Sequence, residues 1–394
     1  MKVCFITNDI FTLGGVQRVL SVLADKLTEN HNVTVLCSSN TEVNRDMYNI
    51  SNNLKVDIKP EIFKSNIFSK SIRKAIKEVN KKTGMLNNKK CAKCLLDIYY
   101  PLSVRKRIIK YINENKYDFV VGVEGIYSIL LGSIYKEIDA KVIGWQHNSY
   151  DAYLNNKERY FWNLDILFEE YITKLDKYVV LNKYDKNKFK EEKAIECQVI
   201  ANPRSFKSKN KSLLKEKQFL AAGRFTYQKG FDLLIESFNK FSKLNSEWNL
   251  VIVGEGEEKE NIKELIKKNN LQNRVTIKSF SDNIKKYFIE SSVLLLPSRW
   301  EGMPMIVLES LEMGVPIISF DITAIQEMIY NKQEGLIVEK YNVDKFSEAM
   351  LKLSQSYDLR KEMGTKCLKK SNEYDIDFIV EKWETMFDNI SSGS

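Results

Sequence analysis

Residues 293–321, with the sequence VLLLPSRWEGMPMIVLESLEMGVPIISFD, contain one complete strand–helix–strand repeat. Short apolar runs at 293–296 and 317–320 predict buried strands, and the apolar segment between them predicts a helix. Pro304 suits the first turn of that helix, because the N–H that proline lacks has no partner there. Buried strands joined by a helix are typical of a parallel sheet, so this stretch predicts an α/β fold.

The same alternation runs along the rest of the chain. The polar, Lys- and Ser-rich stretch 201–218 interrupts it once, and such a stretch is typical of a domain boundary. Further strands are expected at 2–7, 32–37, 119–123, 141–146, 178–181, 219–222, 250–253 and 275–279, with helices such as 16–27 between them. We therefore predict two doubly wound parallel-sheet domains, at 1–200 and 201–372, and a final helix at 373–390 that packs back on the first domain.

Length and composition agree with this division. A chain of 394 residues with 43% hydrophobic content exceeds what one compact core usually holds. We find no apolar run long enough for a transmembrane helix and no signal-peptide layout at the start, so we expect a cytoplasmic protein. The close pair Cys91 and Cys94 lacks a second pair or nearby histidines, since the chain has only 2 His; we expect neither a disulfide framework nor a metal site.

Two glutamates in the opening stretch need an explanation. Glu301 lies just before the expected helix and Glu309 about a turn and a half inside it, on one side with Glu312. The helix is otherwise apolar around most of its surface, so a buried Glu309 carboxylate needs a polar partner. Hydroxyl groups of a sugar or ribose would serve, and so would a structural salt bridge to a basic side chain.

Two further loops follow predicted strands, where open α/β sheets bind ligands. Gly14 and Gly15 directly precede a helix, so their backbone N–H groups could face a phosphate, although a plain tight turn explains them equally well. Arg224 and Lys229, in GRFTYQKG, could grip a diphosphate between them. The alternative for these two cations is a solvated surface position.

Taken together, these motifs resemble those of a known enzyme family. EGMPMIVLE matches the E-x7-E signature of the retaining, nucleotide-sugar-dependent glycosyltransferases of the GT-B fold, and GRFTYQKGFDLLIESF, VIVGEGEE, NRVTIKSF and LESLEMGVPIISFD follow in the family's order. The resemblance is strong after about residue 197 and looser before it, in the half that takes the acceptor. It implies two Rossmann-like domains that face each other across a cleft.

The resemblance also implies roles for individual residues. Glu309 would hold the ribose of the donor, Glu301 the hydroxyls of the transferred sugar, and Arg224 with Lys229 the diphosphate, in place of a metal ion. The remaining positions implied at the donor are the backbone of Gly15, the side chain of His147 beside the reacting sugar, and Gly302, Met303, Pro304 and Phe280. Retention of configuration would follow from attack of the acceptor hydroxyl on the leaving-group side.

The distribution of charged residues along the chain is relevant to the kind of acceptor. The chain carries a net +9, whereas residues 59–118 hold 16 Lys and Arg against 5 Asp and Glu, a net of +11. Basic and apolar residues alternate there at helical spacing, which is typical of a helix that lies on an anionic membrane. We expect Phe63, Ile67 and Ile72 to face the lipid and Lys70, Arg73, Lys74 and Lys77 to face head groups. A solvated basic face remains the alternative.

Three functions are compatible with these features. The first is transfer of a hexose from a nucleotide sugar, expected to be a UDP-sugar, to a polysaccharide or a lipid-linked oligosaccharide at the inner face of the membrane. The second is a nucleotide-sugar epimerase or hydrolase on the same fold. The third is DNA glucosylation or nucleic-acid binding, suggested by the basic region; we expect no nucleic-acid partner.

Overall fold

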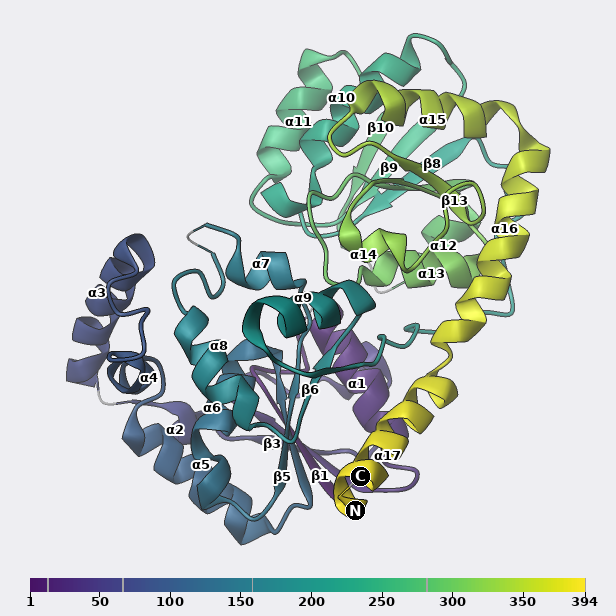
Figure 1. Cartoon of the computed structure of the whole chain (residues 1–394). Helices are drawn as coiled ribbons and strands as arrows, with labels where there is room; N and C mark the ends of the chain where they lie inside the picture. Colours follow the sequence, from purple (N-terminus) through teal and green to yellow (C-terminus); the bar gives the residue numbers. More distant parts are fainter. Residues whose placement is uncertain (13, 66, 158, 281–282, 394) are drawn as a thin grey trace. The chain divides into compact units, whose positions relative to one another are not determined.

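A computed structural model describes residues 1–12, 14–65, 67–157, 159–280 and 283–393, with only the backbone of 67–70. The chain divides into two compact units. Unit 1 comprises Met1–Pro203 and the chain from Ile376 onward, and unit 2 comprises Arg204–Asp375. Each unit has its own parallel sheet surrounded by helices (Figure 1). None of the described helices is long and apolar enough to cross a membrane.

The sheet of unit 1 has seven strands in the order β3-β2-β1-β4-β5-β6-β7. The chain therefore builds outward from β1 to β3 and then returns to place β4 on the other side of β1. The strands are β1 (Lys2–Thr7), β2 (Asn32–Cys37), β3 (Lys55–Ile58), β4 (Phe119–Val123), β5 (Lys141–Trp145), β6 (Lys177–Val180) and β7 (Cys197–Val199).

Helices connect these strands and cover the sheet. Four of them, α2 to α5, lie together in the long connection between β3 and β4. The helices of unit 1 are α1 (Gly15–Leu27), α2 (Pro60–Phe63), α3 (Ile67–Thr83), α4 (Ala92–Tyr99), α5 (Leu102–Asn115), α6 (Glu124–Ile134), α7 (Tyr150–Leu154), α8 (Asp165–Tyr171), α9 (Lys183–Lys193) and α17 (Ile376–Ser392).

The last helix, α17, belongs to unit 1 although the chain reaches it from unit 2. Its Trp383 is fully buried, with ring centroids 4.9 Å from Trp145 of β5 and 6.1 Å from Phe5 of β1. It packs against α1, beside which it lies in Figure 1. Burial of aromatic rings of this size contributes several kcal/mol, on the order of 3–5 for a Trp, so α17 is an integral part of the unit 1 core.

The sheet of unit 2 has six strands in the order β10-β9-β8-β11-β12-β13. The chain again builds outward, from β8 to β10, and then returns to the other side of β8 with β11. The strands are β8 (Gln218–Ala222), β9 (Asn249–Val253), β10 (Val275–Lys278), β11 (Val293–Leu296), β12 (Ile317–Phe320) and β13 (Gly335–Val338).

The helices of unit 2 form a layer on each side of its sheet. Figure 1 shows α10, α11 and α15 on one side and α12, α13 and α14 on the other. These helices are α10 (Phe231–Ser242), α11 (Lys259–Lys268), α12 (Ile284–Ile289), α13 (Met305–Met313), α14 (Thr323–Gln326) and α15 (Val343–Gln355), followed by α16 (Tyr357–Ser371).

The predicted pair of parallel-sheet α/β domains is confirmed. All ten predicted strands are present, with ends that differ by at most one residue, whereas β3, β7 and β13 were not predicted. These three are edge strands, and polar residues interrupt the apolar run of β3 (KVDI) and β7 (CQV), whereas β13 (GLIV) is apolar but only four residues long. The cleft expected between the two domains stays a prediction.

Candidate active site

The two predicted donor loops of unit 2 leave neighbouring strands. The sheet order reverses between β8 and β11, and ligands of open α/β sheets bind at the carboxyl ends of the strands at such a point. Arg224 and Lys229 follow β8, and Glu301 to Pro304 follow β11. The topology thus brings the predicted cations and the first glutamate to one place on the sheet edge.

A glycine sets the path of the β8 loop. Gly230 has φ +65°, and a Cβ on it would lie 2.1 Å from the carbonyl oxygen of Pro297, so no other residue fits without a backbone shift. Beyond this contact, the backbone N–H of Arg299 donates to the carbonyl of Gln228 (2.8 Å), and Gln228 Nε2 donates to the carbonyl of Trp300 (3.0 Å). The two loops are therefore held together as one structure.

The centre of this structure is an ion pair. Lys229 Nζ donates to Glu301 Oε1 at 2.6 Å, and Ser298 Oγ donates to the same oxygen at 2.6 Å. Glu301 is 6% exposed and the Lys229 side chain 19%. A buried carboxylate requires such partners, and here both of them converge on one oxygen. Glu301 Oε2 makes no hydrogen bond within the described residues, so it is the atom available to a ligand hydroxyl.

A second cation, Arg299, stabilises the two loops, and the sequence did not predict it. Arg299 makes two hydrogen bonds to Asp232, from Nη1 (2.9 Å) and Nη2 (2.6 Å), and its guanidinium lies 3.8 Å from the ring centroid of Tyr227. Burial alone would raise the pKa of Asp232, but the hydrogen bonds from Arg299 lower it below its ordinary value. Because its edge is paired with Asp232 and one face lies over Tyr227, Arg299 acts as a structural cation.

The other predicted donor residues of unit 2 differ in exposure. Arg224 is exposed, and its guanidinium has no hydrogen bond or ion pair with the described residues, so it can meet an anion directly. Gly302, Met303 and Pro304 are buried beside Glu301. Phe280 follows β10, two strands away from β8, and is 39% exposed; it has no ring contact within the described chain. Phe280 thus follows a different strand from the loops that carry Lys229 and Glu301.

Glu309 lies on α13 and is almost completely buried, at 3% exposure. Ser205 Oγ donates to its Oε1 at 2.7 Å. The helix runs from Met305 to Met313, and Gly314, whose φ of +69° suits glycine, caps its end. Glu309 therefore lies in the middle of a short helix. A carboxylate at that place has a fixed direction.

Glu312, one turn further on, is the structural carboxylate of α13. It accepts from Arg204 Nη1 (2.8 Å), from the backbone N–H of Ser208 (2.7 Å) and from Ser371 Oγ (3.2 Å), and it also pairs with Lys211. The sequence left a sugar or a salt bridge open as partners of Glu309. Glu312 carries an extensive ion-pair network, which helical periodicity did not predict.

Unit 1 carries the remaining predicted site residues at its own sheet edge. Gly15 is the first residue of α1 and is exposed, so the positive end of that helix faces outward after β1. His147 lies two residues after β5, with its ring centroid 4.2 Å from that of Trp145. Burial lowers the pKa of His147 to about 3, so the ring is neutral at pH 7. Its Nε2 is buried without a hydrogen-bond partner in the described chain.

A polar cluster near these residues was not predicted. Tyr127 Oη and Ser38 Oγ lie 2.6 Å apart, and Ser38 Oγ donates to Asn8 Oδ1 at 3.3 Å. Glu124, the first residue of α6, has φ +70°, a left-handed conformation that costs about 1 kcal/mol or more outside glycine. All four follow β1, β2 or β4, and a position directly after a predicted strand was the signal that could have found them.

Metal ligands do not gather in the described ranges: no three or more His, Cys, Asp or Glu side chains form a group that could hold an ion. Cys94 is exposed on α4 and Cys91 partly buried before it.

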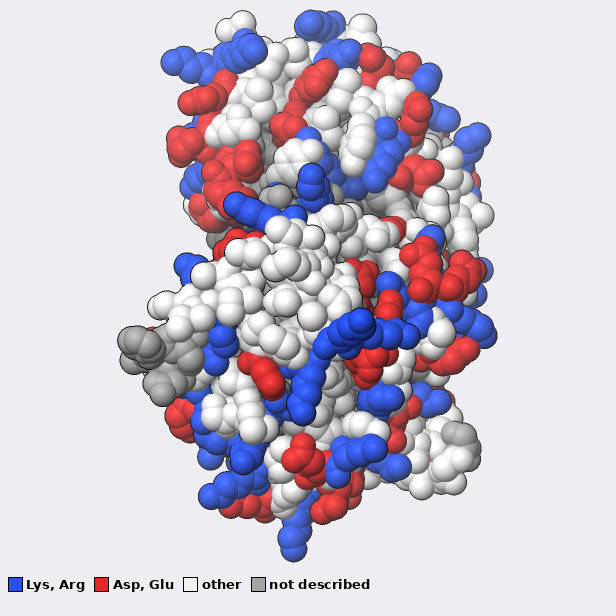
Figure 2. All heavy atoms as spheres, turned by 60° about the vertical axis from the view of Figure 1, so that its left-hand side comes forward, with Lys and Arg blue, Asp and Glu red and all other residues white. Residues whose placement is uncertain are grey.

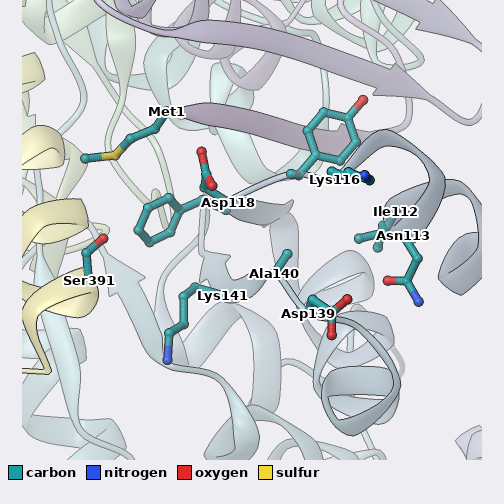
Figure 3. Close-up of a pocket in the computed structure, with 11 residues that line it drawn as sticks. Met1, Ile112, Asn113, Lys116, Asp118, Asp139, Ala140, Lys141 and Ser391 are labelled. Carbon is teal, nitrogen blue, oxygen red and sulfur yellow. The ribbon is translucent and has the colours of Figure 1, made fainter.

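A hollow of about 840 Å³ opens at the other edge of the unit 1 sheet (Figure 3). Its lining comes from the amino ends of β1, β4 and β5 and from α17, and includes Asp118, Lys141 and Ser391. Because ligands of open α/β sheets bind at the carboxyl ends of the strands, this hollow is not the candidate site.

Comparison with known proteins agrees with the geometry of unit 2. Residues 204–370 match the family described as glycosyl transferases group 1. This part of the chain is similar to the domain that defines the family. The matched residues include Arg224, Lys229, Glu301 and Glu309, so the pair and both glutamates lie within the family's own region.

Relatives extend the match into unit 1. An uncharacterized glycosyltransferase of Haemophilus influenzae is 29% identical over 285 residues, which cover 72% of this chain and 79% of the relative. The amylovoran biosynthesis glycosyltransferase AmsD of Erwinia amylovora is 33% identical over 217 residues, covering 53% and 61%. The chain is thus similar to glycosyltransferases, including one of amylovoran biosynthesis.

The fold of the entire chain is also that of a solved structure. Anabaena Alr3699/HepE, crystallised with UDP and glucose, aligns over 99% of this chain and 100% of its own chain, with a TM-score of 0.74 at 13% identity. At that identity the likeness shows the GT-B fold and no more.

Proposed function

We propose that the chain is a retaining glycosyltransferase that moves a hexose from a UDP-sugar to a hydroxyl of a polysaccharide or a lipid-linked oligosaccharide. The observation that carries the proposal is the Lys229–Glu301 pair at the point where the unit 2 sheet order reverses, with Arg224 unpaired on the same loop. A solved structure of the same fold that binds UDP and glucose, and a relative in amylovoran biosynthesis, support this choice of substrates.

In this proposal each carboxylate holds one sugar ring of the donor. Glu309 binds the ribose hydroxyls and Glu301 Oε2 the hydroxyls of the transferred hexose, while Arg224 and Lys229 neutralise the diphosphate. Unit 1 contributes the backbone N–H of Gly15 to the diphosphate and neutral His147 to the hexose. Gly302, Met303 and Pro304 shape the donor contact, and Phe280 stays a proposed donor residue although its strand lies further along the sheet.

Charge development explains how these groups accelerate transfer. As the sugar–phosphate bond breaks, the diphosphate gains negative charge and the sugar becomes oxocarbenium-like, so cations at the phosphate stabilise the transition state. Glu301 Oε1 already accepts two hydrogen bonds, which makes this carboxylate a holder of hydroxyls rather than a nucleophile. The acceptor hydroxyl then attacks on the leaving-group side, and the anomeric configuration is retained.

A panel of nucleotide sugars tests the function. Purified protein should release a nucleoside diphosphate slowly from a UDP-hexose in water, and faster when a glycan acceptor is added. The product of transfer should keep the donor's anomeric configuration by nuclear magnetic resonance. Release from no member of the panel would refute the proposal. Free epimerised sugar without transfer would favour the epimerase, and tight, salt-dependent retention of DNA on filters would favour the nucleic-acid alternative.

Metal independence is a separate prediction. Because positive side chains face the proposed diphosphate site, transfer should continue after treatment with EDTA and dialysis, at a rate within about twofold of the untreated enzyme. Steady-state rates with and without added Mg²⁺ or Mn²⁺ measure this. Complete loss of transfer on chelation, with recovery on adding a divalent ion, would overturn it.

The proposed membrane contact at residues 59–118 is changed by the structure. Phe63 does not face outward, because its ring packs at 6.1 Å against Tyr127, and Lys77 lies 4.3 Å from the ring centroid of Tyr99. Burial, and then the nearby charge of Arg73, lowers the pKa of Lys77. The side chains of Ile67 and Lys70 are outside the described residues.

The outward face of α3 instead carries Ile72, Ala75 and Val79, which are exposed at helical spacing beside exposed Lys74 and Lys82. Figure 2 brings this side of the molecule forward and shows Lys and Arg side chains among uncharged ones. We propose that this α3 face lies on an anionic membrane at the inner side of the cell envelope. Such a helix combines burial of its apolar stripe with about 1 kcal/mol per cation near anionic lipid.

Charge reversal tests the α3 face. Lys74→Glu combined with Lys82→Glu should lower co-sedimentation with phosphatidylglycerol vesicles at least tenfold at about 0.1 M salt, and leave donor hydrolysis unchanged. Lys352→Glu with Lys361→Glu makes the same charge change at exposed helical positions of unit 2 and serves as the control. Equal binding of the two double variants, or equal binding of wild type to phosphatidylcholine, would contradict a membrane role for α3.

A further inference from the structure

Unit 2 begins and ends at one cluster of charged residues. The chain enters the unit at Arg204 and leaves it at Asp375, and the Arg204 guanidinium pairs with Asp375. The backbone N–H of Arg204 also donates to the carbonyl of Tyr374 at 2.8 Å. Both passages of the chain are therefore tied together inside unit 2.

The residues at which the chain enters unit 2 also form hydrogen bonds with α13. Arg204 Nη1 donates to Glu312 Oε2 (2.8 Å) and the backbone N–H of Ser208 to Glu312 Oε1 (2.7 Å), while Lys211 Nζ donates to the carbonyl of Glu312 (2.6 Å). Arg204 and Glu312 are 5% and 2% exposed, so water screens these bonds weakly. We call residues 204–208 the entry segment.

Ser205 lies in the entry segment and reaches the second signature glutamate. Its Oγ donates to Glu309 Oε1 at 2.7 Å, one helical turn before Glu312 on α13. Ser298 makes the corresponding bond to Glu301 Oε1 at 2.6 Å, but from the β11 loop rather than from the entry segment. Each glutamate thus has one serine donor, and only the serine at Glu309 belongs to the entry segment.

We propose that Ser205 is a positioning residue that orients the Glu309 carboxylate for the donor and couples donor binding to the order of the entry segment. This inference rests on the proposed function, in which Glu309 binds the ribose of the donor. A hydroxyl bonded to Oε1 fixes the rotation of the carboxylate, and ribose recognition requires a carboxylate of fixed orientation.

Thermodynamic linkage determines whether donor binding increases or decreases the order of the entry segment. When a ribose hydroxyl donates to Glu309, it holds the carboxylate in the orientation that the Ser205 hydrogen bond also favours, so the two hydrogen bonds support each other. The entry segment is then held more firmly. By reciprocity, a change that frees the entry segment from Glu309 weakens donor binding by the same factor.

Two measurements on Ser205→Ala test the proposal. The dissociation constant for UDP should rise about tenfold, the scale of one hydrogen bond to a charged group, while kcat at saturating donor stays within about twofold. Ser205→Thr keeps the hydroxyl and should restore UDP binding. In amide hydrogen exchange, UDP should slow exchange of the entry segment in the wild type and in Ser205→Thr, and leave it unchanged in Ser205→Ala.

Ser298→Ala is the matched control, since it removes the hydroxyl from the other glutamate. It should lower turnover but keep the effect of UDP on exchange of the entry segment. UDP affinity of Ser205→Ala equal to that of the wild type, or a UDP effect on the entry segment that survives in Ser205→Ala, would overturn the proposal. If the wild type itself binds no UDP and turns over no nucleotide sugar, the proposed function fails, and the role of Ser205 fails with it.

Discussion

Lys229→Ala should lower turnover of the nucleotide sugar about 100-fold or more, the scale for removing one charge partner from a transition state. Two effects act in the same direction. The variant loses the ammonium that meets the developing charge on the diphosphate. It also leaves Glu301, which is 6% exposed, without its cation, so a buried negative charge then faces a negatively charged ligand.

Steady-state kinetics with a UDP-hexose measure this effect. Lys259→Ala is the control, because Lys259 also pairs with a glutamate, at 2.8 Å from Glu255 Oε2, but on the exposed surface after β9. Surface pairs of this kind are worth about 0–1 kcal/mol, so this control should keep full turnover. A Lys229→Ala enzyme with unchanged kinetics would remove Lys229 from the site.

Glu301→Gln should have opposite effects on UDP, the leaving group, and on transfer: UDP should bind more tightly, and transfer should become slower. In the free enzyme Lys229 is paired with Glu301, so a diphosphate must compete with this carboxylate for the ammonium. Glutamine keeps an oxygen for the Ser298 hydroxyl but removes the negative charge. UDP should therefore bind about tenfold more tightly, whereas transfer should fall about 100-fold, because the hexose hydroxyls lose their charged acceptor.

Product inhibition and turnover together measure the second prediction. The inhibition constant of UDP should decrease in Glu301→Gln while kcat decreases as well. A mutation that simply damaged the fold would weaken both binding and turnover, and thermal unfolding of the variant provides the control. Weaker inhibition by UDP than in the wild type would mean that Lys229 and Glu301 do not compete for the diphosphate.

The central strands of both sheets, and the alternation of strands and helices along the chain, could be predicted from the sequence. The reason is that buried parallel strands are continuous apolar runs. VLLL and IISF have no polar residue to obscure the pattern except one serine, whereas KVDI of β3 and CQV of β7 do. The βαβ periodicity therefore identifies the central strands of each sheet and misses three of the four edge strands, with β10 as the exception.

The site was only partly predictable. Lys229 and Glu301 were each singled out, but they are 72 residues apart, and their pairing depends on the reversal of strand order between β8 and β11. Ser205 and Ser298 carry no periodic signal at all. The outward positions expected for Phe63, the last residue of α2, and for Lys77 of α3 were misassigned. Helical spacing shows that a helix has two faces, but not which face packs on its neighbours, here Tyr127 for Phe63 and Tyr99 of α4 for Lys77.

Calorimetric titration of UDP into the wild type, Lys229→Ala and Glu301→Gln tests most directly the claim that a nucleoside diphosphate binds at the Lys229–Glu301 pair. Both substitutions remove a single charge from the same ion pair, but with opposite sign. The account predicts that affinity decreases in Lys229→Ala and increases in Glu301→Gln relative to the wild type. Equal affinities in all three proteins, or a decrease in both variants, would contradict it.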